Sequence, residues 1–125
     1  MDSMNLYYLI AAAALAFYVW KKFQARGIGR YSPEEAKERV KSGSVLLDVR
    51  TAAERKQSSI AGSIHIPLHE LSQKMKTLEK FKSREVIVYC ASGARSSSAA
   101  VQLKKAGFAV GNLRGGIGAW KYANL

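Results

Sequence analysis

One short segment of this 125-residue chain holds the residue types that nucleophilic chemistry needs. It reads Cys90-Ala91-Ser92-Gly93-Ala94-Arg95-Ser96. Small residues around a glycine let the backbone curl, so that successive amide N–H groups point inward and can bind an anion. These amides, the dipole of a following helix and the cation of Arg95 all favour the thiolate form of Cys90. We therefore predict that Cys90 is a nucleophile in an anion-binding loop and needs no general base.

The loop requires a strand before it and a helix after it, and the sequence predicts both. Glu85–Tyr89 is the clearest strand pattern, and a helical pattern runs from Ala94 or Arg95 to Lys105. In parallel α/β sheets, ligands bind at the carboxyl ends of the strands. This position favours a reactive thiol over the usual role of a lone cysteine as a small buried hydrophobe.

Residues 31–125 alternate short apolar runs with helical patterns, which is typical of parallel strands joined by crossover helices. Further strands are expected at Val45–Val49, Ser63–Ile66 and Phe108–Leu113. Further helices are expected at Pro33–Lys41, in the region from Leu68 to Leu78, and at Ile117–Tyr122. The pattern predicts an α/β domain.

Charge and cysteine content narrow the classes of partner. Twenty Lys and Arg against nine Asp and Glu give a formal net charge of +11, which favours anions, although charge alone does not choose among them. We expect an oxyanion substrate and a lipid membrane as partners, and no nucleic acid. A single cysteine excludes an intramolecular disulfide, and with two histidines it argues against a zinc site. We expect neither a metal nor a cofactor.

The most hydrophobic stretch lies near the amino terminus, from Leu6 to Trp20, and contains no charge or helix breaker. Counted from Met4 it spans 17 residues, near the lower limit for a helix that crosses a membrane. Lys21-Lys22 could snorkel to extend it. The basic residues all follow the stretch, which by the positive-inside rule places the amino terminus outside.

We therefore predict a single transmembrane helix over residues 4–22, a juxtamembrane linker over 23–30, and a domain over 31–125 on the cytoplasmic face. The alternative is that the apolar stretch forms a buried amphipathic or core helix.

The loop and several other segments resemble the rhodanese family of sulfurtransferases. Cys90–Ser96 matches the family's Cys-x-x-Gly-x-Arg-Ser loop. Asp48-Val49-Arg50 is similar to its strand-ending Asp-Val-Arg, and Glu54 falls in place of its downstream acid. Ile60–Pro67 is similar to its Ile-x-Gly-Ala-x-x-Ile-Pro segment, and Gly115–Trp120 to its terminal Gly-Gly-x-x-x-Trp. These motifs occur in the family's order over nearly all of the predicted domain.

The resemblance implies a rhodanese domain with a parallel five-stranded sheet flanked by helices, preceded here by the predicted transmembrane helix. In that family the loop cysteine carries sulfane sulfur as a persulfide. On this basis, Cys90 would take sulfur from thiosulfate or a persulfide donor in a ping-pong reaction. The acceptor would be a thiol, cyanide or a protein.

The resemblance also implies roles for the residues around Cys90. The backbone amides of the loop would cradle the persulfide: Ala91, Ser92, Gly93, Ala94, Arg95 and Ser96. The side chain of Arg95 would hold the anionic donor, and Ser96 would cap the helix and donate its hydroxyl to the sulfur. The remaining family matches would brace the loop from beneath: Asp48, Arg50 and Glu54.

Three other functions remain open. Cysteine phosphatases and arsenate reductases place five residues between Cys and Arg, whereas four separate Cys90 from Arg95. A noncatalytic docking module at the membrane would not need the thiol to turn over. A redox sensor would need an external thiol to discharge Cys90, because the chain has no second cysteine.

Overall fold

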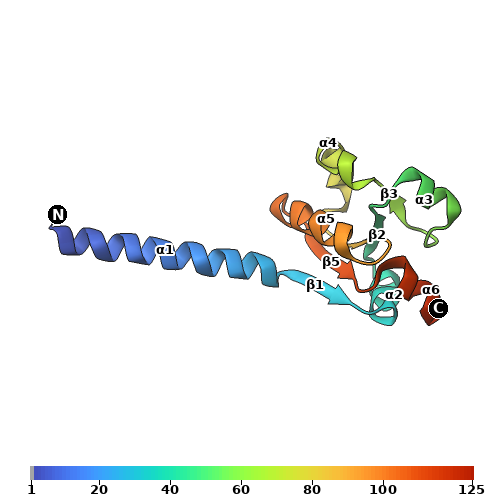
Figure 1. The fold of residues 1–125 in the computed structure, drawn as a ribbon, viewed down its shortest axis with the longest axis horizontal. Helices are drawn as coiled ribbons and strands as arrows, with labels where there is room; N and C mark the ends of the chain where they lie inside the picture. The colour runs from blue at the N-terminus through green and yellow to red at the C-terminus, as the bar shows by residue number, and fades with distance from the viewer. Residues whose placement is uncertain (1) are drawn as a thin grey trace.

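The computed structural model describes residues 2–125, with side-chain detail for all of these except 20–26. A long first helix leads into a five-stranded parallel sheet with helices on both faces (Figure 1). The strands are β1 (Ile28–Tyr31), β2 (Val45–Asp48), β3 (Ile64–His65), β4 (Glu85–Tyr89) and β5 (Ala109–Leu113). The helices are α1 (Ser3–Arg26), α2 (Pro33–Lys41), α3 (Ala52–Gln57), α4 (Leu71–Lys74), α5 (Ala94–Lys105) and α6 (Gly116–Ala123), with 3-10 segments η1 (Leu68–Glu70) and η2 (Met75–Phe81). The prediction of an α/β fold with a parallel five-stranded sheet is confirmed.

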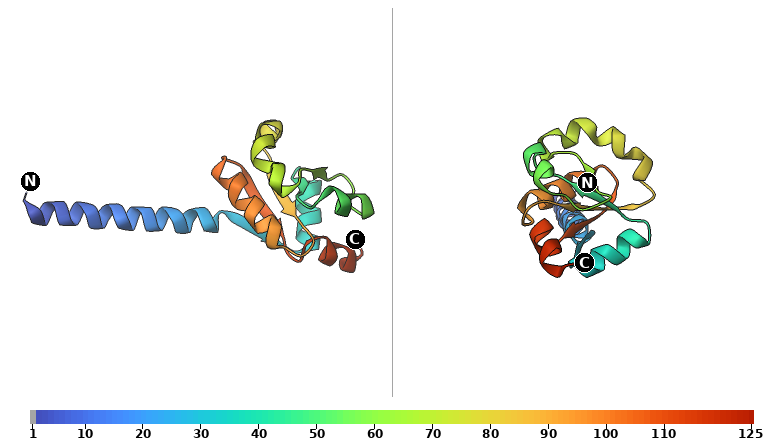
Figure 2. Two further views of the ribbon diagram at one scale, coloured as in Figure 1. Left: turned by 45° about the horizontal axis from the view of Figure 1, so that its top comes forward. Right: turned by 90° about the vertical axis from the view of Figure 1, so that its right-hand side faces the viewer.

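The sheet order β1-β5-β4-β2-β3 puts β4 in the centre. Two buried clusters lie on opposite faces of this sheet. The first joins Val86 and Val88 of β4 to α4, α5 and η2, and the second joins Ile87 and Tyr89 to α2 and α6. In end view, α2 and α6 lie together on one side and α4 with η2 on the other (Figure 2). Because alternate residues of β4 face opposite layers, the strand is a continuous run of buried, largely apolar residues after its first residue, as expected for a strand buried on both faces.

Strand β1 occupies residues that we expected to form a linker. Ile28 pairs with Val110 and Tyr31 with Leu113, so β1 extends the sheet beyond β5. The sequence signal is weak because the strand has only four residues, and Gly29 and Arg30 interrupt the two strand-favouring residues Ile28 and Tyr31. The strand is fixed by its neighbours: the Tyr31 ring covers Gly29 and Gly111, where a Cβ atom would collide with it.

Helix α1 projects away from the sheet as a long rod (Figure 1). The side chains of residues 3–19 are exposed, so this segment does not form the core helix considered as an alternative. Among the described residues, no helix is both long enough and apolar enough to cross a membrane. The prediction of a transmembrane helix over 4–22 was therefore wrong, as was the single-pass placement with the amino terminus outside. About 20 predominantly apolar residues are needed to span the hydrocarbon, whereas this stretch is shorter and includes polar Asn5 and several tyrosines.

The start of α6 is built against the loop that follows β4. Gly115 and Gly116 both have positive φ angles, 73° and 60°. This turn lets Ile117 N–H donate a 2.9 Å hydrogen bond to the carbonyl oxygen of Cys90. A Cβ atom on Gly116 would collide with that same oxygen and lie 2.6 Å from the carbonyl oxygen of Ala91. The glycine pair therefore permits the close approach that ties α6 to the cysteine loop.

We predict that Gly116→Ala lowers the free energy of unfolding by about 1–3 kcal/mol, because it adds backbone strain and a steric clash. Gly118→Ala is the matched control. Gly118 lies within α6, and an added Cβ atom would lie 3.7 Å from the carbonyl oxygen of Ala91, an ordinary van der Waals distance. It should be neutral or stabilising by up to about 1 kcal/mol. Urea unfolding of both variants beside the parent chain measures the difference, and equal stabilities would contradict this account.

Candidate functional site

Cys90 follows β4 directly, at the carboxyl end of the central strand, and is only 1% exposed. The chain then turns through Gly93, whose φ angle is +124°, and α5 begins at Ala94. The turn brings the Gly93 N–H to 3.0 Å from Cys90 Sγ, to which it donates a hydrogen bond. Ser96 Oγ lies 3.4 Å from the same sulfur. The seven-residue loop thus wraps polar groups around a buried sulfur atom.

These contacts decide the protonation of the thiol. Burial raises the pKa of Cys90 because it disfavours the charged form. The Ser96 side chain opposes this, together with hydrogen bonds from the backbone at Ser96, Gly93 and Ser92. The net result is a pKa below the ordinary value of a cysteine thiol. These donors favour the thiolate, which is the nucleophilic form of a cysteine side chain.

Ser96 is completely buried and is held by further hydrogen bonds. Its hydroxyl lies 2.7 Å from Asn112 Oδ1 and 3.1 Å from the carbonyl oxygen of Gly93, and can donate to either. The Asn112 side-chain amide donates to Ser97 Oγ at 3.1 Å, and Ser97 donates to the Gly93 carbonyl at 2.8 Å. A polar network therefore connects β5 to the loop.

Arg95 is paired with Glu54 of α3. Arg95 Nη1 and Nη2 donate to the two carboxylate oxygens at 2.6 and 2.8 Å, the parallel geometry typical of strong arginine–carboxylate pairs. Glu54 is held in turn by Thr51, which forms a capping box with it at the start of α3. The hydrogen bonds from Arg95 are the largest cause of a low pKa for Glu54, about 2 instead of 4.5, and those from Thr51 lower it further against the effect of burial.

Asp48 lies beneath the loop at the end of β2 and is fully buried. Arg50 donates to its two oxygens at 3.0 and 2.8 Å, and Arg55 of α3 donates to Oδ2 at 3.3 Å. The hydroxyl of Tyr89, the residue before Cys90, donates to Oδ2 at 3.2 Å. Burial raises the pKa of Asp48, but the hydrogen bonds from Arg50 and Arg55 outweigh it and keep the pKa below its usual value. This cluster supports the strand that carries the cysteine.

Comparison with known proteins identifies the family. A family model for the rhodanese-like domain matches residues 32–123. The chain belongs to the rhodanese-like domain family. A sulfurtransferase of Allochromatium vinosum is 43% identical over 77 residues, which cover 61% of this chain and 70% of that protein. An uncharacterized protein of Bacillus subtilis is 32% identical over 119 residues, covering 93% of this chain and 92% of that one.

Solved structures agree with this assignment. A rhodanese-related protein from Thermoplasma volcanium has a TM-score of 0.70 at 35% sequence identity. The similarity covers 76% of this chain and 92% of that one. The resemblance found in the motifs is therefore confirmed at the level of the rhodanese domain.

The rhodanese domain places its candidate residues in three groups. Gly93 and Ser96 lie beside the sulfur of Cys90. Arg95 pairs with Glu54. Asp48 and Arg50 form the separate cluster under β4, linked to the loop through Tyr89. No group of three or more His, Cys, Asp and Glu side chains among residues 2–125 is arranged to hold a metal ion.

Sequence reasoning missed three residues of this arrangement: Arg55, Tyr89 and Asn112. Asn112 carried a readable signal, because it lies two residues after Val110 on β5 and so shares the face that packs against α5. A polar residue at such a position needs a partner. Arg55 and Tyr89 gave no comparable signal, since an arginine in a helix and a tyrosine in a strand are ordinary.

The Glu54–Arg95 pair predicts a specific acid sensitivity. Because the pKa of Glu54 is lower in the folded chain, its contribution to stability is present above pH 4.5 and is lost as the pH falls towards about 2. Glu54→Gln should therefore be less stable than the parent chain at pH 7, and this difference should shrink across that interval. Urea unfolding between pH 2 and 7 measures it.

The matched control is Glu79→Gln, which removes a carboxylate from an exposed pair with Lys82 at 3.3 Å. Exposed pairs contribute little, so this variant should follow the parent chain at every pH. A constant stability difference for Glu54→Gln over the whole range would contradict the assigned pKa shift.

Proposed function

We propose that this rhodanese domain is a sulfurtransferase that carries sulfane sulfur as a persulfide on Cys90, with thiosulfate as a competent donor. The observation that carries the proposal is the environment of the sulfur: a buried thiol with a lowered pKa, hydrogen-bonded to the Gly93 amide and adjacent to the Ser96 hydroxyl. Sulfurtransferase relatives such as the Allochromatium vinosum protein support the reaction class.

The first half-reaction is a displacement at sulfur. The Cys90 thiolate attacks the outer sulfur of thiosulfate and forms a new S–S bond. The original S–S bond breaks, and its electron pair leaves with sulfite. The product is a persulfide anion on Cys90. The charge of the persulfide is on its outer sulfur, and the backbone amides of the loop from Ala91 to Ser96 would supply hydrogen bonds to it.

In the second half-reaction, a nucleophilic acceptor attacks the terminal sulfur of the persulfide. A thiol leaves as a new persulfide, or cyanide as thiocyanate, and the electron pair of the broken S–S bond returns to Cys90 as thiolate. The acceptor must come from outside the chain, because Cys90 is its only cysteine. This requirement also applies to the redox-sensor alternative, and transfer to an acceptor distinguishes the two.

Arg95 provides the charge that an anionic donor would meet next to Cys90. Two of its five N–H groups bind Glu54, which leaves donors in the guanidinium plane for a second anion. Its side chain is 37% exposed, so a ligand can reach it from solvent. Glu54 therefore both orients Arg95 and competes with the donor for its charge.

The proposal predicts that thiosulfate adds mass to the chain only when the sulfur of Cys90 is present. Thiosulfate should increase the intact mass of the full chain by about 32 Da, one sulfur atom, and cyanide should reverse it. Cys90→Ser should show neither change. Intact-mass spectrometry under non-reducing conditions reads both steps. A folded chain with a free Cys90 thiol that gains no sulfur from thiosulfate would refute the donor assignment and favour a docking role.

Arg95→Gln should raise the KM for thiosulfate by about tenfold or more, as expected for loss of a charge-assisted hydrogen bond. Arg114→Gln is the control, since it removes the same charge from an exposed pair with Glu35. It should change KM much less. Steady-state thiocyanate formation from thiosulfate and cyanide measures both. If the two substitutions raise KM equally, the effect comes from the overall positive charge and not from Arg95.

A further inference from the structure

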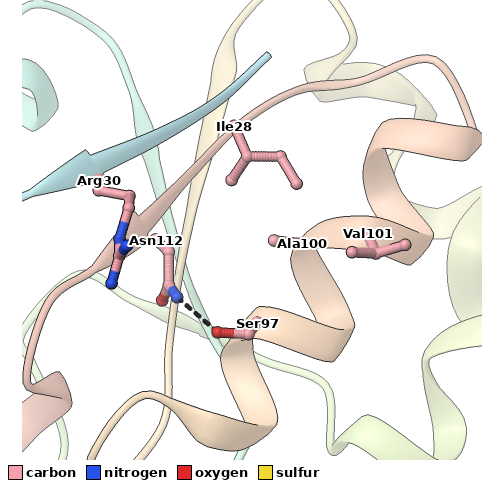
Figure 3. A pocket seen from close by; sticks show the side chains of 6 residues that line it. All are labelled: Ile28, Arg30, Ser97, Ala100, Val101 and Asn112. Carbon is pink, nitrogen blue, oxygen red and sulfur yellow. Dashed lines mark hydrogen bonds between the residues drawn. The ribbon is translucent and has the colours of Figure 1, made fainter. Parts of the chain in front are cut away.

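Asn112 stands between the cysteine loop and an open pocket on the other side. The pocket has a volume of about 330 Å³ and is lined by Ile28, Arg30, Ser97, Ala100, Val101 and Asn112. Figure 3 shows the Asn112 amide next to Ser97 at the polar side of this pocket. Its carbonyl oxygen Oδ1 makes the 2.7 Å hydrogen bond with Ser96 on the side of the loop. Asn112 is thus the link between solvent in the pocket and the group beside the reactive sulfur.

The Ser96 hydroxyl has one hydrogen and three acceptors around it. Asn112 Oδ1 is nearest at 2.7 Å, the Gly93 carbonyl oxygen lies at 3.1 Å, and Cys90 Sγ lies at 3.4 Å. While Cys90 is a thiol, its S–H donates to Ser96 Oγ and the Ser96 hydrogen is free to point at Asn112. A thiolate has no hydrogen of its own and can accept that hydrogen from Ser96 in addition to the Gly93 N–H. Asn112 and the anion therefore compete for one donor.

We propose that Asn112 is a positioning residue that governs how readily Cys90 ionises, by holding the hydroxyl hydrogen of Ser96 away from the sulfur until the sulfur becomes charged. The thiol proton leaves to water, and the Ser96 hydrogen stays on Ser96 and only turns from Asn112 to Cys90. Water in the adjoining pocket then satisfies Asn112 Oδ1. No bond other than the S–H bond is broken.

The rest of the network keeps Asn112 oriented for this competition. Its Nδ2 donates to Ser97 Oγ, and Ser97 donates to the carbonyl oxygen of Gly93. The same Gly93 donates its N–H to Cys90 Sγ. Two of the hydrogen-bonding neighbours of the sulfur, Gly93 and Ser96, are therefore tied into one ring of hydrogen bonds with Asn112. This inference rests on one part of the proposed function, namely that the charged sulfur of Cys90 is the reactive form.

Two substitutions at this position should move the ionisation of Cys90 in opposite directions. Asn112→Ala removes the nearer competing acceptor and leaves only the Gly93 carbonyl oxygen at 3.1 Å, so the Ser96 hydrogen is more available to the thiolate and the pKa of Cys90 should fall by about half a unit. Asn112→Asp keeps the shape, is a stronger acceptor and adds negative charge, so this pKa should rise by about one unit or more. The pH dependence of iodoacetamide alkylation of Cys90 in the full chain gives these midpoints. Shifts in the same direction would overturn the proposal, because loss of structure has no reason to change sign.

Two further variants test whether Asn112 acts on the ionisation of Cys90 through Ser96. In a Ser96→Ala background the shift from Asn112→Ala should disappear, and that from Asn112→Asp should shrink to the direct effect of the charge. Shifts of undiminished size there would overturn the proposal. Val101→Ala alters the pocket wall on α5 without touching the network and should leave the midpoint unchanged; a shift equal to that of Asn112→Ala would overturn it as well.

The alkylation assay also separates this inference from the proposed function. It does not involve sulfur transfer, so it decides the role of Asn112 even if thiosulfate forms no persulfide. If persulfide does form, release of sulfite below the midpoint of the parent chain should be about threefold faster in Asn112→Ala, matching half a pH unit. Normal persulfide formation with unshifted alkylation midpoints in the Asn112 variants would overturn this inference alone.

Discussion

The buried carboxylate of Asp48 is the constraint on which the site depends. A charge with no exposure to water is tolerated only when it is fully paired, and removing one partner from such a pair costs about 3–5 kcal/mol. Asp48 is satisfied by Arg50, Arg55 and Tyr89 together. Tyr89 precedes Cys90, and Arg55 follows Glu54 on α3. The need to pair one carboxylate therefore fixes the end of β4 relative to α3, and with it the sulfur relative to the Glu54–Arg95 pair.

Two opposing effects act on the pKa of Cys90. Burial makes a charged Cys90 costly, whereas the Gly93 amide and Ser96 reduce that cost. The Gly93 amide belongs to a turn with φ of +124°, and Ser96 acts through its side chain from the first turn of α5, so the cost is reduced without a nearby base. Hydrogen bonds of this kind stabilise any anion at that point. The same loop can therefore serve the thiolate and the persulfide in turn.

Sequence alone predicted the parts of the molecule that local signals determine. The loop from Cys90 to Ser96, the strand before it and the helix after it follow from glycine, apolar runs and periodicity. Strand β1 could not be found in this way, because its four residues are held by pairing with β5 and by the Tyr31 ring. The transmembrane helix was predicted from an apolar run without a polar face. A membrane-spanning helix must be both long enough and apolar enough over its whole length, and no described helix meets both conditions. Arg55 gave no local signal, and the pattern around Asn112 indicated only that this polar residue needs a partner, not that its partners are Ser96 and Ser97.

Access to the sulfur differs between the two halves of the proposed reaction. Cys90 is only 1% exposed, so its thiolate is suited to a donor small enough to enter the loop. In the proposed persulfide, the reactive sulfur would lie about 2.05 Å beyond Sγ. Arg95 belongs to the same loop, and its pair with Glu54 is open to solvent, with the two side chains 37% and 31% exposed. A bulky thiol or a protein acceptor can thus meet the outer sulfur without reaching Sγ. In the proposed reaction, the depth of the loop would then limit the size of the donor, and the charged pair would meet the acceptor.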